Sequence, residues 1–360
     1  MFIKDDTVKI NVTASQNYTV YIGSGLRKKA GTLIAEVHEP CTAAIITDSN
    51  VAPLYLEEAA QSMEDAGFKT LTYVFPAGEA SKNISTLSRI LEFLAESHLT
   101  RTDLVVALGG GVTGDMSGFA AAVYLRGIPY VQMPTTLLSA VDSSVGGKTA
   151  VDLDAGKNLV GAFKQPLRVI CDIETLNTLP DEVYDDGMAE CIKYGMLQSQ
   201  KMIDIFSSEH PKEQVLDIIS EAVQIKAMYV ADDEFDTGIR CYLNLGHTIG
   251  HAIERCSGYT IMHGHAVAAG MALITHAGEK MGITEPGTSE KLQIILEKNH
   301  LPTSTEYSVD DLVYDALSDK KRKGDEITII VPENLTHCTT RTVPVSELKN
   351  IITLALTTDH

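Results

Sequence analysis

Short apolar runs alternate with helix-like stretches through the first half of the sequence, and this alternation restricts the fold more than any other feature. The β-rich runs are VKINV (8–12), YTVYIG (18–23), CTAAIIT (41–47), TLTYVF (70–75), DLVVALG (103–109) and YVQMP (130–134). Helix-like stretches over 51–67 and 83–98, and a third after residue 115, lie between them. Strands that are buried on both faces and separated by helices predict a parallel sheet, which binds ligands at the carboxyl ends of its strands.

Helical signals dominate the second half. Helices are predicted over 181–197, 212–230, 246–256, 265–282 and 346–356, with one late strand over 326–332. A chain of 360 residues is expected to form two domains. We therefore predict an α/β protein in which a Rossmann-like parallel-sheet domain over 1–180 is followed by a mostly α-helical domain over 181–360.

Charge and cysteine content exclude several classes of function. The net charge of −19 argues against nucleic-acid binding and against anionic membrane surfaces. The six cysteines form no CxxC pair, which indicates free thiols in a reducing compartment. No secretory signal and no run of about 18 apolar residues is present. We expect a cytoplasmic protein without a nucleic-acid or membrane partner.

A glycine-rich turn suggests nucleotide binding. The segment LVVALGGGVTGDMSGFAAAV (104–123) predicts a strand, a turn and a helix, and Gly109, Gly111 and Gly114 fit GxGxxG. Such a turn lets the backbone approach a pyrophosphate. The standard fingerprint instead belongs to the first βα turn, and a tight βα turn without a nucleotide remains an alternative explanation of these glycines. Asp48, after the run 41–47, is the better candidate to bind a ribose.

The string SSVGGKTAVD (143–152) resembles a P-loop only in part. GxxxxGK[ST] requires glycine at position 142, where this chain has Asp142. ATP hydrolysis is therefore not supported. Lys148, and Lys157 in AGKNLVGAF, remain candidates to contact an anionic substrate.

Histidines and a glutamate indicate a metal site. His247 and His251, in LNLGHTIGHAIE (243–254), are spaced i and i+4 on one helix face, and His263 and His265 follow in MHGHAVAAGM (262–271). Glu190 lies in GMAECIKYG (187–195). One carboxylate and two imidazoles suit Zn²⁺ with positions open for a substrate. Spacing alone does not decide which histidines bind the metal, and it leaves nearby Cys256 as another possible ligand.

Together these strings resemble the 3-dehydroquinate synthase family. The matching strings are PAGEASK (76–82), GGGVTGDMSGFAA (109–121), YLRGI (124–128), MPTTLLSAVDSSVGGKTAVD (133–152), KNLVGAF (157–163), TLNTLP (175–180), GMAECIKYG (187–195), GIRCYLNLGHTIGHAIE (238–254), HGHAVAAGM (263–271) and DKKRKG (319–324). The resemblance implies a lyase that converts 3-deoxy-D-arabino-heptulosonate 7-phosphate (DAHP) into 3-dehydroquinate and phosphate, a step of the shikimate pathway. It also implies NAD⁺ and one divalent metal, Zn²⁺ or Co²⁺, as cofactors.

The resemblance further implies a role for individual residues. The metal ligands would be Glu190, His247 and His263. The NAD contacts would be Asp48, Asn50, Glu79, Ala80, Ser81, Lys82, Gly110, Gly111, Val112, Thr113, Gly114, Asp115, Thr135, Thr136, Lys148, Lys157, Thr175, Leu176, Asn177 and Thr178. The catalytic residues would be His251, Lys148, Lys193, Asp142, Asn244 and Asp236. The substrate and phosphate contacts would be Arg126, Asn158, Lys226, Arg240 and a lysine of the pair Lys320 and Lys321. Arg126 resembles a family arginine that reaches the neighbouring subunit's site, which implies a homodimer.

Two positions depart from the family pattern. Asp236 stands where a glutamate is usual, which keeps the charge but shortens its reach. His265 and Ala269 replace the Glu and Ile of the commoner string HGEAVAIGM. His265 is interpreted as an ordinary helix residue rather than as a partner of the ligand His263.

Other functions share parts of this pattern. A sugar phosphate cyclase such as 2-deoxy-scyllo-inosose synthase uses the same cofactors, but Arg240, Asn244 and the lysines at 320–321 favour a substrate with both carboxylate and phosphate. A polyol dehydrogenase of the glycerol dehydrogenase type would release NADH in bulk. A nucleotide-binding regulatory module would not need Glu190 together with three histidines.

Overall fold

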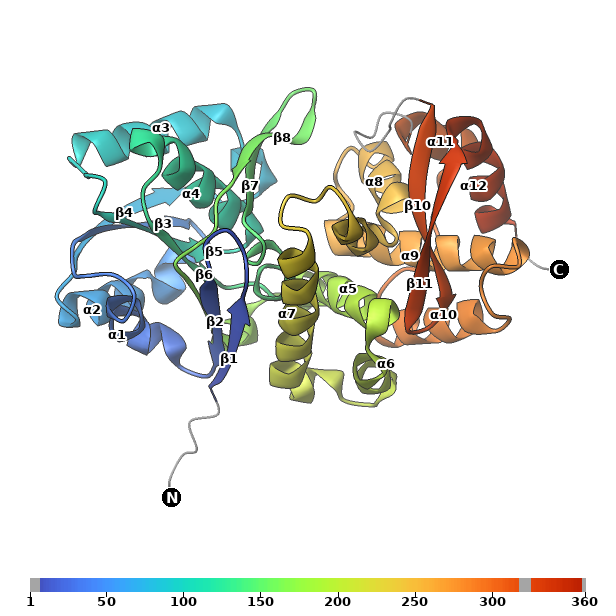
Figure 1. Ribbon diagram of the computed structural model, residues 1–360, viewed down its shortest axis with the longest axis horizontal. Helices are drawn as coiled ribbons and strands as arrows, with labels where there is room; N and C mark the ends of the chain where they lie inside the picture. Colours follow the sequence, from blue (N-terminus) through green and yellow to red (C-terminus); the bar gives the residue numbers. More distant parts are fainter. Residues whose placement is uncertain (1–6, 317–324, 358–360) are drawn as a thin grey trace, which may run out of the picture. The chain divides into compact units, whose positions relative to one another are not determined.

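The computed structural model describes residues 7–316 and 325–357, so Lys320 and Lys321 lie outside the described residues. The chain divides into two compact units (Figure 1). Unit 1 comprises the chain up to Leu179 together with Lys226–Phe235. Unit 2 comprises Pro180–Ile225 and the chain from Asp236 onward. The prediction places a single boundary after residue 180, whereas in the structure the segment Lys226–Phe235 belongs to unit 1.

Unit 1 contains a seven-stranded sheet with the order β1-β2-β9-β6-β5-β3-β4. Its strands are β1 (Val8–Val12), β2 (Tyr18–Gly23), β3 (Thr42–Asp48), β4 (Lys69–Phe75), β5 (Leu104–Gly109), β6 (Tyr130–Pro134) and β9 (Arg168–Asp172). Only the β1–β2 pair is antiparallel; the other neighbours are parallel. The prediction of an α/β protein with a mostly parallel sheet is confirmed.

Helices cover both faces of this sheet (Figure 1). Helices α1 (Ala30–Ala35) and α2 (Glu57–Asp65) pack on one face, and α3 (Ile84–Glu96) and α4 (Gly111–Val123) pack on the other. Because successive side chains of a strand point to opposite faces, Leu104 and Val106 of β5 join the first core and Val105 joins the second. All of β5 is buried, which explains its continuous apolar run.

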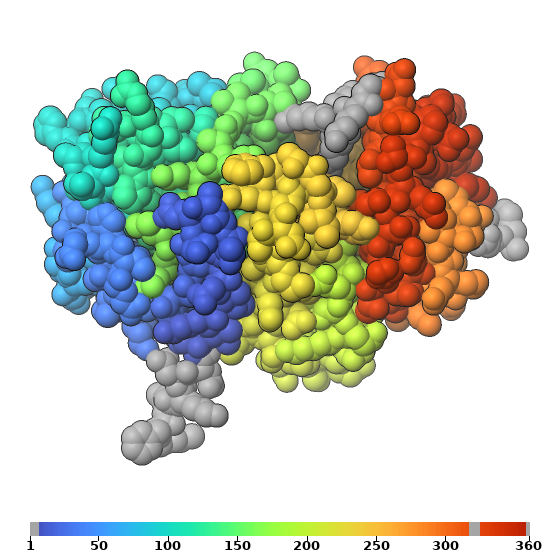
Figure 2. All heavy atoms as spheres, in the orientation of Figure 1, coloured from blue at the N-terminus to red at the C-terminus, as the bar shows by residue number. Residues whose placement is uncertain are grey.

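Three strands of unit 1 were not predicted. Strand β9 completes the centre of the sheet, and β7 (Lys148–Leu153) and β8 (Gly156–Phe163) form a separate antiparallel hairpin. The hairpin, green in Figure 2, reaches the surface, and Leu159 and Phe163 are among its exposed apolar residues. It carries two of the lysines that the sequence suggested for anion binding, Lys148 and Lys157.

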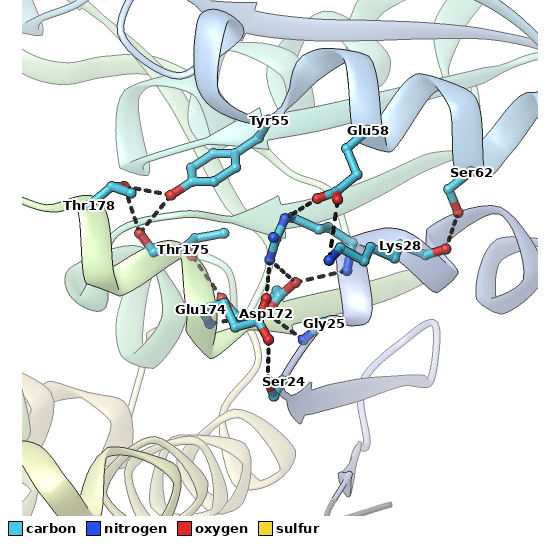
Figure 3. A network of polar contacts seen from close by, with 11 residues as sticks. Ser24, Gly25, Lys28, Tyr55, Glu58, Ser62, Asp172, Glu174, Thr175 and Thr178 are labelled. Atoms are coloured by element: carbon cyan, nitrogen blue, oxygen red, sulfur yellow. Dashed lines mark hydrogen bonds and ion pairs between the residues drawn. The ribbon is translucent and has the colours of Figure 1, made fainter.

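A polar network joins the carboxyl end of β9 to the turn that follows β2 (Figure 3). Arg27 Nη1 donates to Asp172 Oδ2 at 2.7 Å and to Glu174 Oε2 at 2.9 Å, and Arg27 also forms an ion pair with Glu58 of α2. Asp172 Oδ1 accepts the backbone N–H of Gly25 at 2.9 Å. The buried Asp172 therefore joins β9 to the turn after β2.

Unit 2 is mostly helical, as predicted. Its helices are α5 (Asp181–Gln198), α6 (Gln200–Ser207), the first part of α7 (Val215–Asp232), α8 (His247–Cys256), α9 (His263–Lys280), α10 (Thr288–Lys298), α11 (Val309–Ala316) and α12 (Leu348–Leu356). The late strand is β10 (Glu326–Asn334), which pairs with an unpredicted strand β11 (His337–Pro344). No helix among residues 7–316 and 325–357 is long and apolar enough to cross a membrane.

Two glycines let α5, α8 and α9 meet closely. Gly246 has φ +78°, and a Cβ there would lie 2.7 Å from Val267 O, so only glycine fits the turn that begins α8 at His247. A Cβ on Gly264 would lie 1.9 Å from Asp186 O, so glycine is also required where the first turn of α9 contacts α5. These contacts bring the first residues of α8 and α9 close to the middle of α5.

Candidate functional site

Three side chains from three helices converge in unit 2. Glu190 lies in the middle of α5, His247 is the first residue of α8 and His263 is the first residue of α9. One ligand atom from each lies within 4.8 Å of the others. Glu190 is 0% exposed. A carboxylate is rarely buried so completely unless it is paired or binds a metal.

The distances in this triad suit a bound cation better than hydrogen bonds. Glu190 Oε1 lies 3.5 Å from His247 Nε2 and 3.6 Å from His263 Nε2. These separations exceed the usual range of about 2.7–3.2 Å for hydrogen bonds. Two ligand atoms, each about 2.1 Å from one tetrahedral ion, are separated by roughly 3.4 Å. Among the described residues, Glu190 Oε1 has no hydrogen-bond donor, while Oε2 forms an ion pair with Lys193. The donor set therefore fits a divalent metal such as Zn²⁺.

Hydrogen bonds orient both imidazoles of the triad. His247 Nδ1 lies 3.0 Å from Leu245 O, and His263 Nδ1 lies 3.1 Å from Glu254 Oε2. Both acceptors require an N–H at Nδ1, so in the neutral rings the lone pair lies on Nε2, which faces Glu190. Burial opposes protonation of His263, but the carboxylates of Glu190 and Glu254 outweigh it and raise the pKa of His263 to about 10.

Lys193 adds a buried positive charge to the triad. It is 1% exposed and forms an ion pair with Glu190, three residues earlier on α5. A buried carboxylate and ammonium on one helix face are costly unless each compensates the other. The pair places a buried cation beside the candidate metal ligands.

His251 lies one helical turn from His247. The centroid of its ring is 5.2 Å from that of His247 and 5.9 Å from that of His263. His251 also forms a second potential ligand group with Glu254 and His263. The sequence suggested His251; it did not single out Glu254, although Glu254 follows His251 by three residues on the same helix.

Two residues that spacing left open as metal ligands, His265 and Cys256, form hydrogen bonds with other carboxylates. His265 donates its backbone N–H to Asp186 Oδ1 at 3.0 Å, and its Nδ1 lies 3.0 Å from the same oxygen. The hydrogen bond with Asp186 raises the pKa of His265. Cys256 Sγ donates to Asp315 Oδ2 at 3.2 Å, and burial together with Asp315 raises the pKa of this thiol to about 12. A protonated thiol is a poor metal ligand.

Other predicted residues of unit 2 lie near the start of α8 in sequence. Arg240 is 2% exposed and belongs, with Asn244, to the 3-10 helix Ile239–Asn244. Asn244 Nδ2 donates to Cys241 O at 3.1 Å. Asp236 has φ +57°, a left-handed backbone that is uncommon outside glycine, asparagine and aspartate.

Unit 1 contains a separate polar cluster around Lys82. Lys82 Nζ lies 2.6 Å from Asp115 Oδ2 and donates to Asn158 Oδ1 at 2.6 Å. Burial disfavours the charge on Lys82, but neighbouring carboxylates, Asp115 first, hold the pKa of Lys82 above its ordinary value. The cluster joins the glycine turn to the β7–β8 hairpin, since Asn158 lies on β8 and its N–H donates to Asp152 of β7 at 2.7 Å.

The glycine turn lies beside Asp48. Strand β5 ends at Gly109 and α4 begins at Gly111, so the predicted strand, turn and helix are present. Asp48, the last residue of β3, accepts the N–H of Asn50 at 2.9 Å and the hydroxyl of Thr113 at 3.2 Å. These groups occupy the carboxyl ends of neighbouring parallel strands, where such sheets bind ligands.

A second buried lysine of unit 1 contacts Asp142. Lys226 is 5% exposed, and its Nζ donates to Asp142 Oδ1 at 2.8 Å and to Asp142 O at 2.6 Å. Lys148 is exposed at the start of β7, and Lys157 Nζ lies 3.7 Å from Glu79 Oε1. Asp142 and Lys226, far apart in sequence, are thus brought together.

The remaining predicted residues of unit 1 lie at three places. Thr135 and Thr136 follow β6, and the buried Thr135 donates its N–H to Gly109 O at 3.0 Å. In the 3-10 helix Ile173–Thr178, the hydroxyls of Thr175 and Thr178 donate to Asp172 O and Thr175 O, at 2.8 and 3.0 Å. Arg126 is exposed, with φ +69°.

Comparison with known proteins gives a consistent family. The model described as "3-dehydroquinate synthase N-terminal" matches residues 72–186, and "3-dehydroquinate synthase C-terminal" matches residues 187–322. A 3-dehydroquinate synthase from Streptococcus sanguinis (strain SK36) is 40% identical over 353 residues, which are 96% of this chain and 99% of the relative.

Solved structures with the same fold include two other cyclases. A 2-deoxy-scyllo-inosose synthase complexed with carbaglucose-6-phosphate, NAD⁺ and Co²⁺ has a TM-score of 0.87 at 25% identity, covering 96% of this chain and 99% of its own. The 2-epi-5-epi-valiolone synthase ValA from Streptomyces hygroscopicus subsp. jinggangensis 5008, with NAD⁺ and Zn²⁺ bound, has a TM-score of 0.86 at 23% identity, covering 97% and 99%.

Proposed function

This chain belongs to the 3-dehydroquinate synthase family, and from that premise we propose which of its residues serve the reaction. The reaction is the conversion of DAHP into 3-dehydroquinate and phosphate, through transient oxidation at C5, β-elimination of phosphate, re-reduction, ring opening and aldol closure. The observation that carries this conclusion is 40% identity to a 3-dehydroquinate synthase across 96% of the chain. The inosose synthase of the same fold is only 25% identical.

NAD⁺ and one divalent metal are the cofactors, as in the cyclase structures of the same fold. Glu190, His247 and His263 are the proposed metal ligands, because their geometry and buried carboxylate fit a cation. When bound, the metal supplies a Lewis acid that lowers the pKa of a substrate hydroxyl, and NAD⁺ accepts and returns the hydride. The enzyme is thus a sugar phosphate cyclase, and we propose that it acts as a phosphate-eliminating lyase of the shikimate pathway.

His251 is the proposed acceptor of the hydroxyl proton. Its ring lies beside both ligand histidines, at centroid distances of 5.2 and 5.9 Å, without belonging to the Glu190 triad. A neutral imidazole at this place takes a proton at a ring nitrogen as the alcohol becomes a ketone. No separate base is proposed for the elimination, since the substrate's phosphate can take that proton.

Buried cations are proposed to bind the acidic groups of the substrate. In unit 2 these are Lys193 and Arg240, 1% and 2% exposed, with Asn244 nearby in sequence. Arg240 offers a fork of N–H donors that suits a carboxylate or a phosphate. In unit 1 we propose the buried Lys226, together with Asp142, Asn158 and the exposed Lys148. Such local cations allow a chain of net charge −19 to bind an anionic substrate.

The NAD contacts are proposed at the carboxyl ends of β3, β5 and β6. Asp48 is placed to accept bonds from ribose hydroxyls, and the turn from Gly110 to Asp115 offers backbone N–H groups to the pyrophosphate. Lys82, held beside Asp115, adds a positive charge to this turn.

We further propose a cytoplasmic homodimer. The exposed Arg126 is the residue through which one subunit would contribute to the site of the other. The proposal predicts that the molecular mass in solution, measured by light scattering, is twice that of the chain, and a monomeric mass would contradict it.

A direct assay tests the function. Purified protein with NAD⁺ and Co²⁺ or Zn²⁺ should release phosphate from DAHP and form 3-dehydroquinate. NADH should not accumulate at 340 nm, because the hydride is returned. Turnover of glucose 6-phosphate without turnover of DAHP would favour an inosose synthase, and bulk NADH would favour a polyol dehydrogenase.

His251→Ala should separate proton transfer from metal binding. We expect kcat to fall on the order of 10²–10⁴-fold, the usual contribution of a positioned acid or base. Bound metal should stay at one equivalent, because the triad of Glu190, His247 and His263 is intact. Metal analysis and rapid-mixing absorbance of transient NADH measure the two effects. A wild-type rate of NADH formation would rule out this role for His251.

A further inference from the structure

Glu254 is a buried carboxylate to which neither the family resemblance nor the spacing argument gave a role. It is 3% exposed and lies on α8, seven residues after His247 and three after His251, so all three side chains share one helix face. Its Oε2 lies 3.1 Å from His263 Nδ1 on α9. Burying a carboxylate is costly, so a buried carboxylate of this kind is expected to have a defined partner.

The position of Glu254 relative to His263 decides what it can do. His263 faces Glu190 through Nε2, at 3.6 Å, and faces Glu254 through Nδ1, on the opposite edge of the ring. A carboxylate that accepts a bond from Nδ1–H fixes the tautomer, sets the plane of the ring and makes Nε2 a stronger ligand. His247 is oriented in the same way, but by the neutral carbonyl of Leu245.

A different role for Glu254 also has to be considered. His251, Glu254 and His263 have ligand atoms within 4.8 Å of one another and could themselves hold a cation. In that arrangement Glu254 would be a ligand, and Glu190 would not be needed. The triad with Glu190 is favoured, because the buried Glu190 Oε1 has no hydrogen-bond donor among the described residues and faces both His247 and His263, whereas Glu254 is hydrogen-bonded to a ring nitrogen.

We propose that Glu254 is a positioning residue for the metal centre, acting through His263 without touching the metal. The inference rests on the metal site of the proposed function. The negative charge of Glu254 strengthens His263 as a ligand, so this residue tunes metal affinity. Its loss weakens metal binding and leaves the number of bound ions unchanged.

Metal binding by purified apoprotein tests this proposal without relying on activity. The dissociation constant for Co²⁺ is measured by competition with a chelating dye, and the ligand geometry by the visible absorption of the Co²⁺ form. We expect Glu254→Ala to bind Co²⁺ about 10–100-fold more weakly, the usual loss for such an outer carboxylate. Glu254→Gln, whose amide oxygen still accepts from Nδ1–H, should lose less, with a spectrum closer to wild type.

Glu279→Gln is the matched control. Glu279 is a partly buried glutamate of α9 whose Oε1 accepts one N–H, from Ser289 at 2.8 Å, and its variant should bind Co²⁺ like wild type. The melting temperature of each apoprotein monitors folding, and the isosteric Glu254→Gln carries the test if Glu254→Ala does not fold.

Three results would overturn the inference in different ways. Wild-type affinity and spectrum in Glu254→Ala would show that Glu254 does not tune the site. Retained tight binding in Glu190→Gln, with binding lost in Glu254→Ala, would make Glu254 a ligand. A wild-type protein that binds no Co²⁺ would overturn the metal centre itself, and this inference with it.

Discussion

Replacing His247 with alanine should remove the bound metal and abolish turnover. His247 supplies one of only two imidazoles in the triad, and its Nε2 lies 3.5 Å from the buried Glu190. A bound metal contributes several kcal/mol of transition-state stabilisation, and each 1.4 kcal/mol or so corresponds to a tenfold change in rate. Loss of the metal should therefore lower kcat/KM by about 10³-fold or more. Metal content by elemental analysis and phosphate release from DAHP are the two measurements.

His276→Ala is the control for this prediction. His276 is likewise a histidine of unit 2, but it lies on α9 and its Nε2 is 2.9 Å from Thr357 O, away from the triad. That variant should keep one equivalent of metal and its activity. If His247→Ala retained both metal and turnover, His247 would not be a ligand and the triad would have to be reassigned.

Gly264→Ala should strongly destabilise unit 2. Its Cβ would lie 1.9 Å from Asp186 O and 2.9 Å from Asp186 Oδ1, so α9 must move away from α5. Overpacking of this kind costs about 1–3 kcal/mol, and occasionally more. For a unit of this size each kcal/mol lowers the melting temperature by roughly 2–4 °C, so we expect a fall on the order of 10 °C. Calorimetry of the apoprotein measures it.

The same displacement should weaken metal binding, because His263 immediately precedes Gly264 and would move relative to Glu190. Gly195→Ala is the matched control: it lies on α5, and its Cβ would meet the end of the flexible Ile203 side chain at 3.0 Å and Met202 Cβ at 3.3 Å, but no backbone atom within 3 Å. Alanine is also favoured over glycine within a helix by about 1 kcal/mol, which offsets the close contact. Equal stability of the two variants would contradict the close packing of α9 against α5.

The parallel sheet was predictable because its central strands β3, β5 and β6 are buried on both faces and therefore largely apolar. The β7–β8 hairpin could not be predicted because its strands are partly exposed and carry no continuous apolar run, and the polar Lys148 and Lys157 within them are more typical of ligand binding than of a buried strand. Strand β11 was missed because its exposed threonines and arginine, in HCTTRTVP, carry no continuous apolar signal. The return of Lys226–Phe235 to unit 1 depends on tertiary contacts such as Lys226 with Asp142, which no local pattern encodes.

For the candidate site, helical spacing placed His247 and His251 on one face but could not rank four histidines. Which of the four histidines can join Glu190 depends on how α5, α8 and α9 pack together. This packing places His263 beside Glu190 and His265 beside Asp186. Glu254 was discoverable, since it continues the i, i+4, i+7 series from His247. A glutamate on a helix face is usually a solvated residue, and only the fold shows that this one is buried.

The strand order of unit 1 has a consequence for biosynthesis. Strand β2 lies between β1 and β9, with Thr19 opposite Arg168 and Gly23 opposite Asp172, although β3 to β6 are made in between. While the chain emerges from the ribosome, β3 to β6 can assemble, but the β1–β2 pair has no place in the sheet until Asp172 has been translated. Contacts so distant in sequence form slowly, and an unpaired strand edge invites association with other chains. The Arg27–Asp172 ion pair therefore forms late in synthesis. A nascent chain that stalls before β9 is complete lacks the strand that joins the β1–β2 pair to β6.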